Sequence, residues 1–116
     1  MPPHTYGTFT KALQAGKLEP AYYFLGAENV LKDEATTALL DKVLDPGLRD
    51  FNLDIRSAQQ LEPEDVLSLC TTLPMMADRR VVVVRDVEAW KRKTRGKKAV
   101  LEYLQKPIPE TLLVLV

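Results

Sequence analysis

The sequence predicts an α/β fold with three layers, in which helices cover both faces of a parallel sheet. Apolar runs typical of buried strands alternate along the chain with segments of helical periodicity, as in proteins built from strand–helix–strand crossovers. The run Val81–Val84 is apolar at four consecutive positions, which indicates a strand buried on both faces. The length of 116 residues fits one domain. Because the apolar run 111–116 ends the sequence without a polar tail, we expect residues 1–116 to be a fragment of a longer chain.

The first half of the chain is expected to contain two helices and two strands. A short helix over 6–15 precedes a buried strand over 21–26, and a longer amphipathic helix over 29–44 follows. The next strand, over 51–58, shows the alternation of a strand with one exposed face, which indicates a position towards the edge of the sheet. Its expected inward residues are Phe51, Leu53 and Ile55, and its expected outward residues are Asn52, Asp54 and Arg56.

The second half repeats the alternation. Acidic residues and Pro63 mark the start of a helix over 62–73, and the valine strand occupies 79–88. A helix over 96–107 and a last strand over 111–116 complete the chain. The residues expected to face the core from the last helix are Val100, Leu101 and Leu104.

Composition excludes several classes of function. Sixteen basic residues balance sixteen acidic ones, so no overall charge favours nucleic acid or an anionic membrane. The one histidine, His4, and the one cysteine, Cys70, cannot build a metal cluster or a histidine-based nucleophile. Cys70 lies in an apolar helical pattern and is expected to be a core thiol in a reducing compartment. No signal peptide or membrane-spanning run is present, which predicts a cytoplasmic location.

The turn after the first predicted strand partly matches a phosphate-binding loop. It keeps Gly26 and Lys32 of the pattern G-x-x-x-x-G-K-[ST]. Leu31, however, replaces the second glycine, and Asp33 replaces the hydroxyl that would hold magnesium. We therefore expect a degenerate site without a cofactor, although an ATP-binding protein of unusual sequence is the enzyme alternative.

The valine strand carries a second partial match, to the apolar run ending in an acid that closes a Walker B motif. Arg85 stands at the position of the first acid, and Asp86 and Glu88 come later. Any buried parallel strand ends in polar residues, so this match alone indicates little. Together, the two matches suggest an ATPase-like fold that lacks its catalytic residues.

Two adjacent methionines, Met75 and Met76, lie between the 62–73 helix and the valine strand. Pro74 disfavours helix at the preceding residue, so the chain should leave the helix before them. If exposed beside the polar run 78–80 (Asp78, Arg79 and Arg80), they would form an apolar interface anchor. The alternative is that both finish the apolar face of the helix and are core residues.

A basic run follows Trp90 and holds six cations in eight residues, namely Lys91, Arg92, Lys93, Arg95, Lys97 and Lys98. Such runs are most often solvated loops. The alternative is contact with DNA phosphates, which would make this a nucleic-acid-binding module with salt-sensitive affinity.

Several segments, in order, resemble the amino-terminal domain of the delta subunit of bacterial DNA polymerase III. They are "AYYFLGAEN", "FNLDIRSAQQ", "LSLCTTLPMMADRRVVVVRDVE" and "VLEYLQKPIPETLLVLV", and together with the acidic helix after the first they cover nearly the whole chain. The resemblance implies an AAA+ fold without ATPase activity and a three-domain chain of which this is the first domain.

The resemblance also implies a function. Delta subunits are non-catalytic parts of the clamp loader of a DNA-directed DNA polymerase holoenzyme, and their amino-terminal domain binds and opens the ring-shaped beta sliding clamp. By position, the clamp-binding residues would be Leu73, Met75 and Met76. The missing domains would join the gamma/tau and delta prime subunits. The chain departs from the usual pattern because its anchor is two methionines rather than Leu and Phe, and because Thr71 and Thr72 stand upstream where Gln is frequent.

Overall fold

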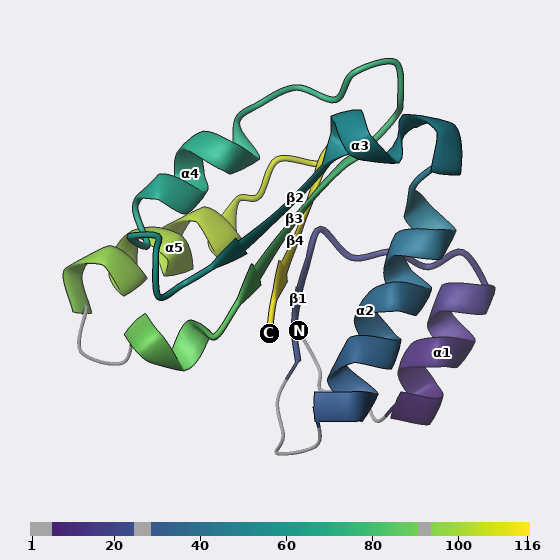
Figure 1. Cartoon of the computed structure of the whole chain (residues 1–116), viewed down its shortest axis with the longest axis horizontal. Coiled ribbons are helices and arrows are strands. Elements are labelled where there is room, and N and C mark those ends of the chain that lie inside the picture. The colour runs from purple at the N-terminus through teal and green to yellow at the C-terminus, as the bar shows by residue number, and fades with distance from the viewer. Residues whose placement is uncertain (1–5, 25–28, 91–93) are drawn as a thin grey trace.

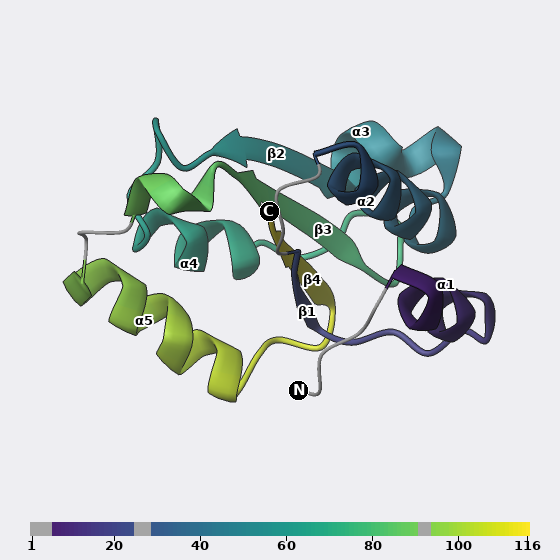
Figure 2. The ribbon, with the colours of Figure 1, turned by 90° about the horizontal axis from the view of Figure 1, so that it is seen from below.

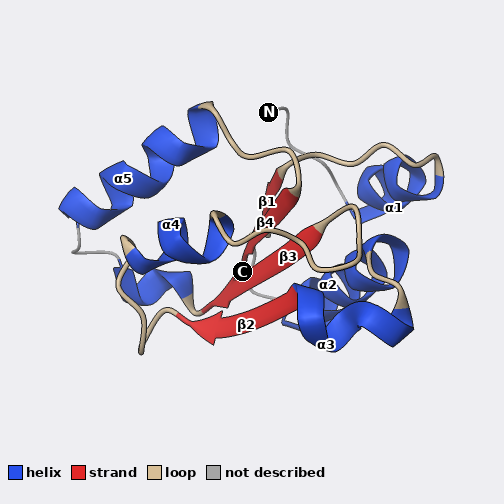
Figure 3. Cartoon of the chain, turned by 90° about the horizontal axis from the view of Figure 1, so that it is seen from above, coloured by secondary structure: helices blue, strands red, loops and turns tan. Residues whose placement is uncertain are grey.

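Four parallel strands form one sheet at the centre of the protein (Figure 1). The computed structural model describes residues 6–24, 29–90 and 94–116. The strands are β1 (Ala21–Tyr23), β2 (Leu53–Ser57), β3 (Arg80–Arg85) and β4 (Thr111–Leu115). Their order across the sheet is β1-β4-β3-β2, with β2 at one edge (Figure 3). The predicted parallel sheet and the predicted edge position of the second strand are confirmed.

Helices pack on both faces of this sheet, which confirms the three layers. The helices are α1 (Tyr6–Gln14), α2 (Asn29–Val43), α3 (Arg49–Asn52), α4 (Asp65–Cys70) and α5 (Thr94–Gln105), with 3-10 turns η1 (Pro46–Leu48) and η2 (Val87–Trp90). Helices α1 and α2 cover one face, and α4 and α5 cover the other (Figure 2).

The valines of β3 show how one strand supplies both halves of the core. Val81 and Val83 pack against α1 and α2, whereas Val82 and Val84 pack against α4 and α5. All four are fully buried, as the uninterrupted apolar run predicts. Burying such a side chain stabilises the fold by about 1.5–3 kcal/mol, so these valines contribute to the core on both faces of the sheet.

The expected alternation of the second strand is wrong at its start. Residues 49–52 form α3, so the strand begins at Leu53 rather than at Phe51. Phe51 is exposed and Asn52 is fully buried, the reverse of the expectation, because a helical turn does not place residues on alternating sides. Ile55 is also half exposed, because the helices cover this edge strand only near Leu53.

Two predicted helices also differ in detail. The helix expected over 62–73 is the shorter α4, and at its end hydroxyl groups rather than a further helical turn bind the Ser68 and Cys70 carbonyls. In α5, Leu101 is exposed and not a core residue. The inward face consists of Val100, Tyr103 and Leu104, whose spacing of three and four residues places them on one side of the helix.

The first strand is shorter than the predicted 21–26. Strand β1 ends at Tyr23, whose side chain is exposed, and the Phe24 amide still donates to the Leu115 carbonyl at 2.8 Å. Leu25 and Gly26 lie outside the described residues.

Candidate functional site

The loop between α4 and β3, residues 71–79, carries three exposed apolar side chains. We call it the α4–β3 loop. The exposed fraction is 77% for Leu73, 55% for Met75 and 83% for Met76. The predicted exposure of the methionines is therefore confirmed, and neither is a core residue. Three exposed apolar side chains within four residues are a feature of the kind that marks an interface.

The loop begins where α4 ends, and its first residues are tied to that end. The hydroxyl groups of Thr71 and Thr72 both donate to the Ser68 carbonyl, at 2.9 and 3.2 Å. The buried hydroxyl of Thr111, the first residue of β4, donates to the Cys70 carbonyl at 2.8 Å. These bonds satisfy carbonyl groups that a helix end leaves without partners, so the helix ends here at low cost.

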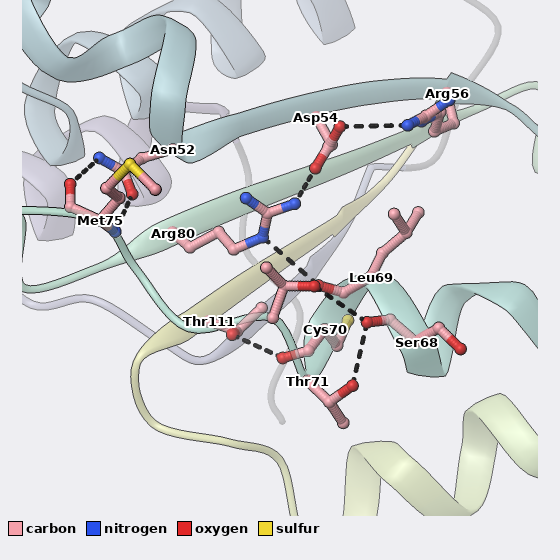
Figure 4. A network of polar contacts seen from close by, with 11 residues as sticks. Asn52, Asp54, Arg56, Ser68, Leu69, Cys70, Thr71, Met75, Arg80 and Thr111 are labelled. Carbon is pink, nitrogen blue, oxygen red and sulfur yellow. Dashed lines mark hydrogen bonds and ion pairs between the residues drawn. The ribbon is translucent and has the colours of Figure 1, made fainter.

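The middle of the loop is held by Asn52, the last residue of α3 (Figure 4). Its side-chain oxygen accepts from the Met75 amide at 2.7 Å, and its side-chain nitrogen donates to the Met75 carbonyl at 2.8 Å. The same nitrogen donates to the Leu48 carbonyl at 3.2 Å. Asn52 itself is fully buried, so its side of these part-buried bonds lies away from water.

Arg80 holds the far end of the loop. Its guanidinium forms an ion pair with Asp54 on β2, and its Nε donates to the Leu69 carbonyl at 3.4 Å (Figure 4). Its backbone amide donates to the Glu110 carbonyl at 2.8 Å. Burial lowers the pKa of Arg80 from its ordinary value. Arg80 is therefore a buried support of the loop, and the expectation that it rims the apolar surface is wrong.

The sequence offers little local signal for these supports. Asn52 and Asp54 were expected on the outward side of one strand, and Thr111 lies 41 residues from the carbonyl that it binds. From the sequence alone, polar residues at such positions are expected to face solvent, because their hydrogen-bonding partners are distant along the chain.

The two partial nucleotide motifs meet at one point in the structure. Asp33 and Arg85 form an ion pair at 3.4 Å, and both side chains are exposed. The carboxylate thus stands where the phosphate-binding pattern needs a hydroxyl, and the guanidinium stands where the Walker B pattern needs an acid. Leu31 is partly exposed, while Gly26 lies outside the described residues.

Asp86, the acid after Arg85, has a different partner. It adopts a left-handed backbone conformation with φ of 60°, and its carboxylate accepts from the Ser57 hydroxyl at 3.0 Å. This bond joins the ends of β2 and β3, so Asp86 supports the sheet edge.

Only part of the basic run lies within the described residues. Lys91, Arg92 and Lys93 lie outside the described residues, and Arg95, Lys97 and Lys98 belong to the first turns of α5. Lys98 is exposed and Lys97 is partly buried. DNA contact by this run stays a prediction.

Two features are absent from the part of the chain that the structure describes. Within residues 6–24, 29–90 and 94–116, His, Cys, Asp and Glu side chains do not gather in a group of three that could hold a metal ion. In the same part of the chain, no helix has the length and apolar character needed to span a bilayer.

Comparison with known proteins identifies the family. Residues 22–116 match the family described as "DNA polymerase III, delta subunit". A curated relative, DNA polymerase III subunit delta of Bacillus subtilis, is 31% identical in an alignment over 111 residues that covers 90% of this chain and 32% of the relative.

A solved structure agrees with the sequence match. The structure described as the Bacillus subtilis DNA clamp loader delta protein superposes with a TM-score of 0.87 at 26% identity, over 96% of this chain and 34% of that chain. The chain thus spans about a third of the length of the relatives that it matches. With the sequence match over residues 22–116, this places the chain in the DNA polymerase III delta subunit family of DNA-replication clamp-loader proteins.

Proposed function

We propose that this chain is the clamp-binding domain of a clamp-loader delta subunit and that the α4–β3 loop is its anchor. The observation that carries the proposal is the exposure of Leu73, Met75 and Met76 on a loop fastened at its start, middle and end. Methionine is unbranched and polarizable, so it adapts to an apolar pocket in which Leu or Phe also fits. The partner would be the beta sliding clamp.

The anchor would act on the clamp without any chemical step. A ligand shifts an equilibrium towards the state that it binds more tightly, so the loop and its flanking helix α4 would favour an open ring if they bind that state better. Further domains of a longer, three-domain chain would bind the other loader subunits, gamma/tau and delta prime.

We also propose that the domain has an AAA+ architecture with a degenerate nucleotide site. The Asp33–Arg85 ion pair supports this, since each residue replaces a magnesium-binding group and the two neutralise each other. Titration calorimetry with magnesium-ATP should give no saturable heat. A saturable signal that disappears in Lys32→Ala would instead favour the ATP-binding alternative.

A direct binding measurement tests the anchor. Purified sliding clamp is immobilised, and the intact protein is compared with its Met75→Ala/Met76→Ala variant by surface plasmon resonance. Full burial of a methionine side chain contributes about 1.5–3 kcal/mol. Each methionine is already partly buried in the free protein, so the clamp can bury only the fraction that is still exposed. The expected loss is therefore about 2–4 kcal/mol, or about 30- to 1,000-fold in affinity.

Leu101 provides the matched control. It is an apolar side chain with a similar exposure, on α5 rather than on the loop. Leu101→Ala should leave clamp affinity unchanged. Unchanged binding of the double methionine variant, or an equal loss in both variants, would contradict the proposal.

A further inference from the structure

Buried polar side chains are concentrated at the α4–β3 loop. Among the described residues, the buried polar or charged ones are Thr36, Asn52, Arg80 and Thr111. Thr36 bonds only within its own helix, to the Lys32 carbonyl. The other three all bind the loop or the last turn of α4 that leads into it. A buried polar group is costly unless it is hydrogen-bonded. The concentration of such groups at one loop therefore indicates that their bonds fix the conformation of the loop.

We propose that Asn52 is a positioning residue, which holds the α4–β3 loop in its clamp-binding shape before the clamp arrives. This rests on the function proposed above. Asn52 lies nearest to the anchor, because both of its bonds to the loop are made to Met75 itself. The side-chain amide binds the Met75 N–H and C=O together, as a neighbouring strand would. It thereby replaces a backbone partner that the loop lacks.

The loop needs such a support because part of its backbone is unfavourable. Met76 has φ of 57°, a left-handed conformation that residues other than glycine rarely adopt. The residue that Asn52 holds comes directly before it. Without the side-chain amide of Asn52, the α4–β3 loop would sample other conformations, and the clamp would have to select the correct one. Fixing one residue in advance is equivalent to about tenfold in affinity.

The main test combines Asn52→Ala with the methionine variant in a double-mutant cycle. In the intact protein, Asn52→Ala should lower clamp affinity by about tenfold. In the Met75→Ala/Met76→Ala background, the same change should cause little further loss, because Asn52 acts through those side chains. Losses that simply add would overturn the proposal, and so would unchanged affinity.

Thr36→Ala separates positioning from general destabilisation. It removes another buried polar side chain whose hydrogen bond lies within α2. Asn52→Ala should weaken clamp binding, and Thr36→Ala should not, when the two variants lose a similar amount of folding stability. Asn52→Asp is the second variant should Asn52→Ala fold poorly. It keeps the shape and the acceptor for the Met75 amide but lacks the donor for the Met75 carbonyl, so it should weaken binding as well. Equal affinity losses in Thr36→Ala and Asn52→Ala would refute a positioning role.

Hydrogen exchange tests the support without any partner. The Met75 amide should exchange slowly in the wild type and at least about tenfold faster in Asn52→Ala, while the amides of β3 keep their protection. Equal exchange at Met75 would overturn the proposal whatever the binding result. If the wild type shows no affinity for the clamp, the proposed function fails, and this measurement alone decides whether Asn52 holds the loop.

Discussion

Replacing Asp54 with asparagine removes the charge that faces the Arg80 guanidinium while keeping the size of the side chain. In the ion pair, 8% of the Arg80 side chain and 24% of the Asp54 side chain are exposed. Arg80 also binds the Leu69 carbonyl, so the guanidinium cannot turn to water without breaking a second contact. Asp54→Asn therefore leaves a buried cation without its counter-charge.

The expected cost follows from burial. Removing one partner of a buried ion pair costs about 3–5 kcal/mol. Asp54 keeps some exposure, and an asparagine oxygen still accepts a hydrogen bond from Arg80, so we expect a smaller loss of about 2–4 kcal/mol. Against a total stability of about 5–15 kcal/mol for a domain, this is a large fraction.

Urea denaturation measures this loss of stability. Unfolding is monitored by the fluorescence of Trp90, the one tryptophan, and by circular dichroism. Asp41→Asn is the matched control, because the Asp41–Arg49 pair has a similar chemistry but Asp41 is 65% exposed. That variant should lose less than about 1 kcal/mol. Equal losses in the two variants would refute the reasoning that burial determines the value of the Asp54–Arg80 pair.

The structure also predicts the direction in which three other substitutions change stability. Trp90→Phe should cost about 1–3 kcal/mol in urea denaturation followed by circular dichroism, because the indole N–H donates to the Ala58 carbonyl at 3.1 Å and to another carbonyl at 2.8 Å. No loss would show those bonds to be dispensable. Gly96→Ala should lower the melting temperature although alanine favours helix, because the new Cβ would lie 2.8 Å from the Pro63 ring; a higher melting temperature would mean that the ring yields. Burial raises the pKa of the Cys70 thiol from 9.0 to about 11, so the thiol loses its proton in the unfolded chain first. Relative to Cys70→Ala, wild-type stability should fall by up to about 1.4 kcal/mol per pH unit between pH 9 and 11, and a parallel pH dependence of the two proteins would contradict this.

Much of the fold was predictable because its signals are local. The four-valine run of β3 requires burial on both faces, and the structure places alternate valines in the two halves of the core. Pro74 predicted that the chain leaves its helix before Met75 and Met76, and both are exposed. These predictions depend on the preferences of a few neighbouring residues, which hold whatever the rest of the chain does.

The wrong predictions share a different cause. Phe51, Asn52 and Ile55 were assigned by strand alternation, but α3 occupies the first two positions and the sheet edge leaves the third half exposed. Leu101 was placed inward, although the inward face of α5 passes through Val100 and Leu104. An apolar residue near a boundary, or one position from an inward face, has no local signal that decides its side.

The sequence by itself determined the order along the chain of the strands and of the longer helices α1, α2, α4 and α5, together with the family resemblance, since each depends on periodicity or on short motifs. Only the tertiary structure decided that β4, the last strand, lies between β1 and β3. Only it brought Asn52 to Met75 across 23 positions of sequence and Thr111 to Cys70 across 41. The physical reason is that a buried hydrogen bond depends on where packing places both partners, and no local pattern carries that information.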